Sequence, residues 1–278
     1  MEKEKLEAIE LWTNDPCGAA DAEKYGIGSE KFFNEVMGYR YNIYAPWLKK
    51  AIVRLEVRNK KILEVGCGMG MDLLQFAKRG AKVVGIDLVS YHIELAQELF
   101  KMKISSRNYE IFQADAESLP FKNESFDLVY SFGVLHHTPN IKKAIREIWR
   151  VLKPDGKVMV GLYHRNSYYY WFNLFFIQGI IKRRLHKMTM DEILRRTEFS
   201  RSEAKPLVKV YSRRDCYVLF KDFINVKVRT YHFTNDQIFP SHINPFFSKY
   251  LSCFDFLGWY VLSSGSKSAL SNQKYQGK

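Results

Sequence analysis

The sequence lacks the features that mark disulfide-rich, zinc-structured or membrane-spanning proteins. Among its 278 residues there are four cysteines, far apart and without a C-x-x-C pair: Cys17, Cys67, Cys216 and Cys253. This pattern argues against a structural zinc site or a disulfide framework and fits a reducing compartment. The charged start Met-Glu-Lys-Glu-Lys contains no apolar signal segment, and no run reaches the roughly 18 apolar residues of a spanning helix. We therefore expect a soluble, cytoplasmic protein.

Acidic residues are scarce in the last part of the chain. The formal net charge is +13, and residues 166–278, with 18 basic and 8 acidic side chains, contribute +10 of it. The densest part, Lys182 to Arg214, has eleven basic and four acidic residues. Such an excess is compatible with nucleic acid, an anionic membrane surface, an acidic substrate or a merely solvated face. It indicates that the C-terminal part has a role of its own.

Short apolar runs alternate with amphipathic segments between residues 61 and 163. The runs predict five strands: Lys61–Gly66, Ala81–Asp87, Tyr109–Gln113, Phe126–Ser131 and Lys157–Tyr163. The segments between them predict three helices: Asp72–Lys78, Ser90–Met102 and Ile141–Leu152. Strands joined by helices imply an α/β fold, a parallel sheet with helices on both faces. Two later strands, at Asn225–His232 and Gly258–Ser263, would make the sheet seven-stranded.

The rest of the chain is less regular and divides around this core. Residues 1–60 predict one or two helices packed over the edge of the sheet, residues 61–163 are the core, residues 164–211 an inserted cap, and residues 212–278 the return to the sheet. The cap opens with Tyr168–Ile181, which has almost no polar face. Three interpretations stay open for this run: a buried helix, a lid over a lipophilic substrate, or an interfacial helix flanked by basic anchors. Pairing of two copies through it would give a homodimer.

A glycine-rich turn follows the first predicted strand. Gly66, Gly68 and Gly70 allow a sharp turn and a close approach of a ligand to the backbone. The dinucleotide pattern requires glycine where Met71 stands, and the Gly-Lys-Ser/Thr of a phosphate-binding loop is absent. The turn therefore predicts a ligand other than a dinucleotide. Asp87, at the end of the second strand, is placed to accept both hydroxyls of a ribose.

Five motifs in this order and spacing resemble a known family. EVGCGMG, GID, ADAESLPF, FDLVYSFGVLHH and REIWRVLKPDGKV are similar to the motifs of class I S-adenosylmethionine-dependent methyltransferases, most of all the small-molecule enzymes of ubiquinone and menaquinone biosynthesis. The resemblance covers about residues 60–163. It implies a Rossmann-like, mostly parallel sheet of seven strands, the last one antiparallel, with S-adenosylmethionine across the carboxyl ends of the strands. Asp155 replaces the second glycine of the usual K-P-G-G turn, which Asp tolerates.

The resemblance also implies contacts with the cofactor. Asp72 would reach the methionine amino group, Asp87 the ribose, and Asp115 with Ala116 the adenine edge. The other implied contacts come from the loop, from the adenine stack and from the backbone after the fourth strand: Glu64, Gly66, Gly68, Gly70, Leu88 and Ser131. In the N-terminal segment, Arg40 is a candidate partner of the methionine carboxylate.

Methyl transfer requires an aligned acceptor and, for most acceptors, a base that takes a proton. His136 and His137, after the fourth strand, are the candidate bases, although either could instead cap a helix or pack against the cofactor. Tyr163 and His164 end the fifth strand and are candidates for the same crevice. The seven histidines are scattered without ligand spacing, so we expect no metal.

The sequence as a whole predicts a methyltransferase that acts on the oxygen or carbon of a small, hydrophobic or amphiphilic acceptor, with peripheral membrane contact open. A nucleic-acid methyltransferase is the less favoured alternative, since no N/D-P-P-Y/F tetrapeptide is present. A non-catalytic module of the same fold is the other alternative, against which the intact glycines and acidic residues of the cofactor site argue.

Overall fold

The fold is built on one seven-stranded sheet, seen in a computed structural model that describes residues 2–106, 108–198, 204–233 and 252–269. The strand order is β3-β2-β1-β4-β5-β7-β6. Their bounds are β1 Lys61–Val65, β2 Lys82–Asp87, β3 Tyr109–Gln113, β4 Phe126–Phe132, β5 Leu152–Tyr163, β6 Ile224–Tyr231 and β7 Tyr260–Ser266. Neighbours from β3 to β5 are parallel, and β7 runs antiparallel to both β5 and β6. The predicted α/β class and the antiparallel last strand are confirmed.

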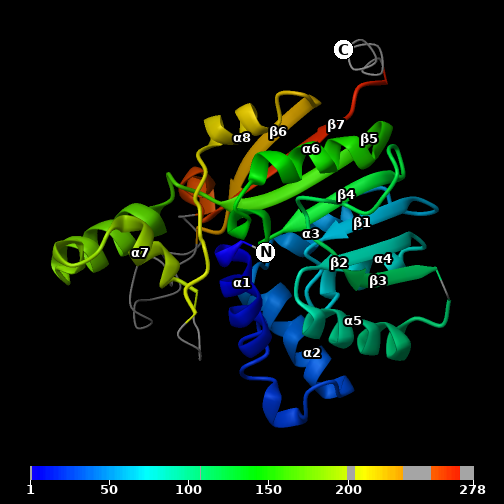
Figure 1. Ribbon diagram of the computed structural model, residues 1–278, viewed down its shortest axis with the longest axis horizontal. Helices are drawn as coiled ribbons and strands as arrows, with labels where there is room; N and C mark the ends of the chain where they lie inside the picture. The colour runs from blue at the N-terminus through cyan, green and yellow to red at the C-terminus, as the bar shows by residue number, and fades with distance from the viewer. Residues whose placement is uncertain (1, 107, 199–203, 234–251, 270–278) are drawn as a thin grey trace.

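Helices cover both faces of the sheet (Figure 1). On one face the core is completed by α2 (Glu30–Tyr39), α3 (Leu48–Val53), α4 (Met71–Lys78) and α5 (Ser90–Lys103). On the other it is completed by α6 (Ile141–Val151) and α8 (Arg213–Leu219). Within β1, Ile62 belongs to the first core and Leu63 to the second, because successive side chains point to opposite faces. Burial on both faces explains why the strands read as continuous apolar runs.

The N-terminal segment has more helices than the sequence predicted. Its described residues form α1 (Lys3–Asn14), a short 3-10 turn η1 (Glu23–Tyr25), α2, a π-helical turn η2 (Arg40–Tyr44) and α3. Gly26 and Gly28, both with positive φ, reverse the chain before Ser29 caps α2. Three α-helices form where one or two were expected, and the turn at Gly26 and Gly28 separates the second of them from the segment before it.

Strand β5 begins five residues earlier than predicted, at Leu152 instead of Lys157. Leu152 pairs with Phe126, and the next register position joins Lys157 to Leu128, so the Lys-Pro-Asp-Gly turn lies at a bulge between them. Asp155 has a φ of 57° there. Its left-handed backbone agrees with the expectation that Asp tolerates the position of the usual glycine.

The aromatic run of the cap forms a π-helix, η4 (Tyr169–Ile181), that is far from buried. Only Leu174 and Gly179 are buried in it, whereas Trp171 is 50% and Ile181 60% exposed. The interpretation as a buried helix was therefore wrong. η5 (Arg184–His186) and α7 (Met190–Arg195) follow, and this part lies at one end of the molecule in Figure 1. A last 3-10 helix, η6 (Ser252–Leu257), precedes β7.

No helix among the described residues is long and apolar enough to cross a membrane.

Helix α6 offers a direct test of local stability. The side chain of Asn140 accepts a hydrogen bond from the backbone N–H of Lys143 at 3.0 Å, and so caps the first turn. We expect Asn140→Ala to lower the free energy of unfolding by about 1 kcal/mol, because a backbone donor loses its partner. Urea denaturation measures this change. Lys142→Ala, on the exposed side of the same turn, is the control, and equal effects of both changes would contradict the capping role.

Candidate active site

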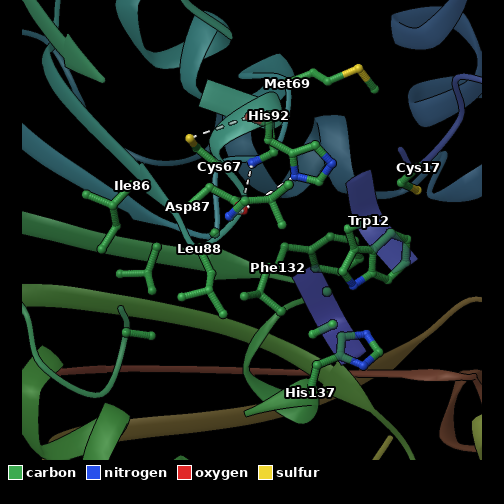
Figure 2. A pocket seen from close by; sticks show the side chains of 18 of the residues that line it. Trp12, Cys17, Cys67, Met69, Ile86, Asp87, Leu88, His92, Phe132 and His137 are labelled. Atoms are coloured by element: carbon green, nitrogen blue, oxygen red, sulfur yellow. Dashed lines mark hydrogen bonds and ion pairs between the residues drawn. The ribbon is translucent and has the colours of Figure 1, made fainter. Parts of the chain in front are cut away.

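A crevice lies at the carboxyl ends of β1, β2 and β4, between the sheet and the N-terminal segment. Its walls come from α1, from the π-helical turn η2, from the glycine-rich turn and from the segment after β4 (Figure 2). Strand ends of this kind are where open α/β sheets bind ligands. The crevice therefore lies at the strand ends where the cofactor was expected.

The glycine-rich turn forms the floor of the crevice. The backbone N–H groups of Gly66 and Cys67 both donate to the carbonyl of Ile86, at 2.7 and 2.9 Å, which bends the chain sharply after β1. A Cβ at Gly68, where φ is +51°, would meet no atom within 4 Å, so it would project into free space on which a ligand can lie. A Cβ at Gly66 would lie 2.3 Å from Val134, and one at Gly70 3.3 Å from Ala96. Gly68 thus permits close approach, whereas Gly66 and Gly70 permit packing.

Asp87 ends β2 and points its carboxylate at this turn. One oxygen accepts from the N–H of Gly68 at 2.8 Å and the other from the N–H of Val89 at 3.0 Å. His92 Nδ1 lies 3.4 Å from the second oxygen, as Figure 2 shows. Burial alone would raise the pKa of Asp87, but His92 and the two N–H groups hold it below its usual value. The carboxylate is ionised, and the oxygen that faces Gly68 keeps a lone pair for a ribose hydroxyl.

Arg40 and Asp72 form a buried ion pair at the other side of the turn. Asp72 accepts two hydrogen bonds from the Arg40 guanidinium and one each from the hydroxyls of Tyr41 and Tyr130, both at 2.6 Å. Burial alone would raise the pKa of Asp72, but Arg40 keeps it below its usual value. A carboxylate has about four acceptor positions, so protein groups already fill those of Asp72. Its predicted contact with a methionine amino group requires one of these partners to leave.

Arg40 itself suits its predicted role better. Its side chain lines the crevice, and its bonds to Asp72 use Nε and one terminal nitrogen. The remaining terminal N–H groups can donate to a ligand carboxylate.

Helix α1 covers the side of the crevice that contains Asp115. Lys5 Nζ lies 2.8 Å from a carboxylate oxygen of Asp115 and 3.2 Å from one of Glu117, and all but 12% of the Lys5 side chain is buried. Leu88 and Ala116 line the crevice beside Asp115. Lys5 could not be predicted from the sequence, because a lysine in an amphipathic helix does not reveal what the helix covers.

Comparison with known proteins agrees with this geometry. Residues 63–160 match the protein family described as "Methyltransferase domain". These residues form a methyltransferase domain similar to those of class I S-adenosylmethionine-dependent enzymes. The matched residues span β1 to β5, which carry the glycine-rich turn, Asp87 and Asp115.

Named relatives are similar to this chain over part of their length. A sterol 4-C-methyltransferase of Caenorhabditis elegans is 39% identical over 112 residues, which are 40% of this chain and 33% of that protein. A ubiquinone biosynthesis O-methyltransferase of Pseudomonas fluorescens is 36% identical over 130 residues, 46% of this chain and 55% of that protein. The chain thus spans about half the length, or less, of these curated relatives.

A solved structure shares the fold of this chain over most of its length. It is a complex between the Haloferax volcanii Trm112 methyltransferase activator and a methyltransferase. One of its chains aligns with a TM-score of 0.59 and 16% identity over 96% of this chain and 99% of that one.

The two candidate histidines of the methyltransferase occupy a short 3-10 turn, η3 (Leu135–His137), but have different environments. His136 is fully buried, with its ring 3.8 Å from the Tyr163 ring centre to centre, and does not line the crevice. Burial, and next the neighbouring His137, place the pKa of His136 well below its usual value. His137 lines the crevice beside Trp12 (Figure 2). Of the two predicted bases, only His137 faces the ligand space.

The orientation of His137 is fixed by the cap. Its Nδ1 lies 2.8 Å from the carbonyl oxygen of Leu207, so Nδ1 carries the hydrogen and Nε2 has the free lone pair. Nε2 lies 3.8 Å from a carboxylate oxygen of Glu198, to which the Tyr163 hydroxyl donates at 2.9 Å. Burial and the Glu198 carboxylate raise the pKa of Tyr163 well above its usual value, which keeps its proton in place. Glu198 follows no motif, and the sequence analysis missed it.

Several predicted site residues lie outside the crevice. Ser131 is fully buried and donates to the carbonyl of Val65 at 2.8 Å, so β4 contributes Phe132, Gly133 and Val134 in its place. Glu64 is buried behind the turn, where burial and Asp72 raise its pKa well above the usual value. The predicted contact of Ser131 was through its backbone, which the buried side chain leaves open, whereas the Glu64 side chain does not line the crevice.

Of the two candidates at the end of the fifth strand, only one lines the crevice. Tyr163 lines the crevice, but His164 is buried with Nδ1 3.0 Å from the carbonyl of Gly258 and does not line it. No described residue of 164–211 lines the crevice, so the aromatic run is not the predicted wall of an acceptor pocket. The side chain of Cys253 lies outside the described residues.

Proposed function

We propose that this methyltransferase transfers the methyl group of S-adenosylmethionine to an oxygen or carbon of a small, lipophilic acceptor. The observation that carries the proposal is the juxtaposition, in one crevice, of an ionised Asp87 beside the open Gly68 turn and an apolar wall that contains Trp12 and Phe132. When bound, the cofactor supplies an electrophilic methyl group on sulfur. The chain itself has to bind it, orient the acceptor and exclude water.

The residues present fit this cofactor. Asp87 would hold the ribose hydroxyls, and Leu88 with Ala116 would contact the adenine. The Asp115 carboxylate would accept a hydrogen bond from the adenine amino group. Arg40 would hold the methionine carboxylate through its remaining N–H groups. Lys5 forms an ion pair with Asp115, so the adenine amino group would either share the carboxylate with the lysine or displace it.

The acceptor would lie between the methionine end and His137. Trp12, Tyr44, Phe132 and Tyr163 make this part of the crevice aromatic, which favours an acceptor with an apolar body. The Nε2 lone pair of His137 is positioned to take the acceptor's proton, since Nδ1 is committed to Leu207. The named relatives act on a sterol and in ubiquinone biosynthesis, which agrees with a lipophilic acceptor.

A labelled-methyl assay tests the acceptor class. Purified protein, S-adenosylmethionine with a labelled methyl group and a panel of sterols and phenolic quinone precursors should give label in the organic extract. Label that enters only nucleic acid, or none that leaves the cofactor although calorimetry shows cofactor binding, would contradict the proposal.

We further propose that η4 contacts an anionic membrane surface. Its exposed side chains include Trp171, Phe176 and Ile181, and the exposed Lys182 and Arg183 follow directly. Burying a large apolar side chain contributes about 1.5–3 kcal/mol, and basic residues next to such a patch favour anionic lipids. Because η4 does not line the crevice, membrane contact suits it better than the role of a lid.

Vesicle flotation tests this contact. We expect the protein to float with vesicles containing anionic lipid and not with neutral ones, and to dissociate as salt is added. Trp171→Glu should abolish flotation, whereas Ile27→Glu, at an equally exposed apolar residue of the N-terminal segment, should not. A wild-type protein that ignores both vesicle types, or a dimer by light scattering that Trp171→Glu dissociates, would contradict the proposal.

A further inference from the structure

Three potential metal ligands meet beside the acceptor end of the crevice. His136, His137 and Glu198 each bring one ligand atom to within 4.8 Å of the others, although Glu198 is distant from the histidines in sequence. The expectation of no metal rested on ligand spacing along the chain, which does not register a ligand supplied by the cap. The fold therefore creates a cluster that the sequence pattern did not contain.

These side chains lack the partners that buried polar groups normally have. Both ring nitrogens of His136 and Nε2 of His137 are buried without a hydrogen bond. Leaving such atoms unpaired is costly, and native structures rarely do it. One nitrogen of each histidine lies near the Glu198 carboxylate, so a shared cation would give each ring one of the partners that it lacks.

The geometry also suits a shared ion. His137 Nε2 and the Glu198 oxygen are 3.8 Å apart, too far for a hydrogen bond. Two ligands on one tetrahedral zinc ion, with bonds of about 2.1 Å, lie roughly 3.4 Å apart, so the three side chains, whose ligand atoms lie within 4.8 Å of one another, would have to draw together around the ion. The contact of His137 Nδ1 with the Leu207 carbonyl is the kind of outer partner that orients a metal-bound imidazole.

We propose that His136, His137 and Glu198 bind a divalent transition metal, with zinc as the ion that two imidazoles and one carboxylate favour. His137 belongs to both the cluster and the crevice, so a bound ion would lie next to the space assigned to the acceptor. There it would hold an oxygen of the acceptor in place of water. Nε2 would then be bound to the metal, so the acceptor's proton would pass to water and not to His137. This role rests on the proposed function, whereas the binding of the metal does not.

Metal analysis of tag-free protein tests the site. After purification, removal of metal with a chelator, reloading with zinc and desalting, we expect zinc in an equimolar amount by mass spectrometry. Loading with Co²⁺ should give the visible absorption of a nitrogen- and oxygen-ligated ion. His137→Gln and Glu198→Gln should each weaken zinc binding by at least about 10-fold. His186→Gln, at an exposed histidine of η5, is the control for adventitious surface binding and should change nothing.

Calorimetry with S-adenosylmethionine on the same preparations separates the outcomes. If the variants still bind the cofactor, they are folded, and their loss of zinc reports on the site alone. Wild-type protein that retains no zinc, or variants that retain as much as wild type, would overturn the metal site and leave the proposed function standing. Zinc that binds as expected in a protein that does not bind S-adenosylmethionine would overturn the proposed function instead.

Discussion

Asp87→Ala lowers the affinity for S-adenosylmethionine by an expected 10- to 150-fold. The ribose hydroxyls lose a buried, ionised acceptor, and a hydrogen bond to a charged group contributes about 1.5–3 kcal/mol. The backbone N–H groups of Gly68 and Val89 also lose their acceptor, which loosens the turn that carries the cofactor. Isothermal titration calorimetry with S-adenosylmethionine and with its demethylated product measures the change.

Two control variants accompany Asp87→Ala. Asp87→Asn keeps the shape and one acceptor oxygen but removes the charge, so its affinity should fall between those of wild type and the alanine variant. Asp222→Ala removes an exposed carboxylate from another part of the chain and should leave binding unchanged. An unchanged dissociation constant in Asp87→Ala, with thermal unfolding that shows a folded protein, would refute the assignment of Asp87 to the ribose.

His137→Ala is expected to lower turnover by about 10²- to 10⁴-fold while the cofactor still binds. The substitution removes the imidazole that would contact the acceptor's oxygen, either directly through Nε2 or through a bound metal. The rate of transfer of the labelled methyl group, with the cofactor at saturation, measures the effect.

His164→Gln is the matched control, because His164 is also buried at a strand end and does not line the crevice. His136→Ala is expected to destabilise the fold as well, since its ring packs on Tyr163. Full turnover of His137→Ala with the true acceptor would mean that the acceptor reacts without help from this residue.

The sequence predicted those parts of the site that depend on local patterns. An apolar run that ends in glycine or aspartate identifies both the strand and its functional end, so the turn at Gly68 and the placement of Asp87 followed directly. Lys5, Trp12 and Glu198 could not be found in this way. Each comes from an element far from the core motifs in sequence. Packing brings Lys5 and Trp12 to the crevice and Glu198 to His136 and His137.

Side-chain direction was the second limit on prediction. The strand ends were known, but Ser131 and His164 turn into the core, whereas Phe132 and Tyr163 next to them face the crevice. Similarly, the sequence placed Arg40 and Asp72 near the same ligand without indicating that they bind each other. Partners of this kind are set by tertiary packing and not by the hydrophobic period.

The crevice draws its walls from more of the chain than the family match covers. Residues 63–160 contain the glycine-rich turn and Asp87, but Trp12 and Arg40, which also line the crevice, precede this segment. An excised fragment of those residues would therefore lose the cover of its ligand. Relatives that share the segment but differ outside it can bind the same cofactor and still select different acceptors. The residues that match the family and those that cover the crevice therefore lie in separate stretches of sequence that meet only after folding.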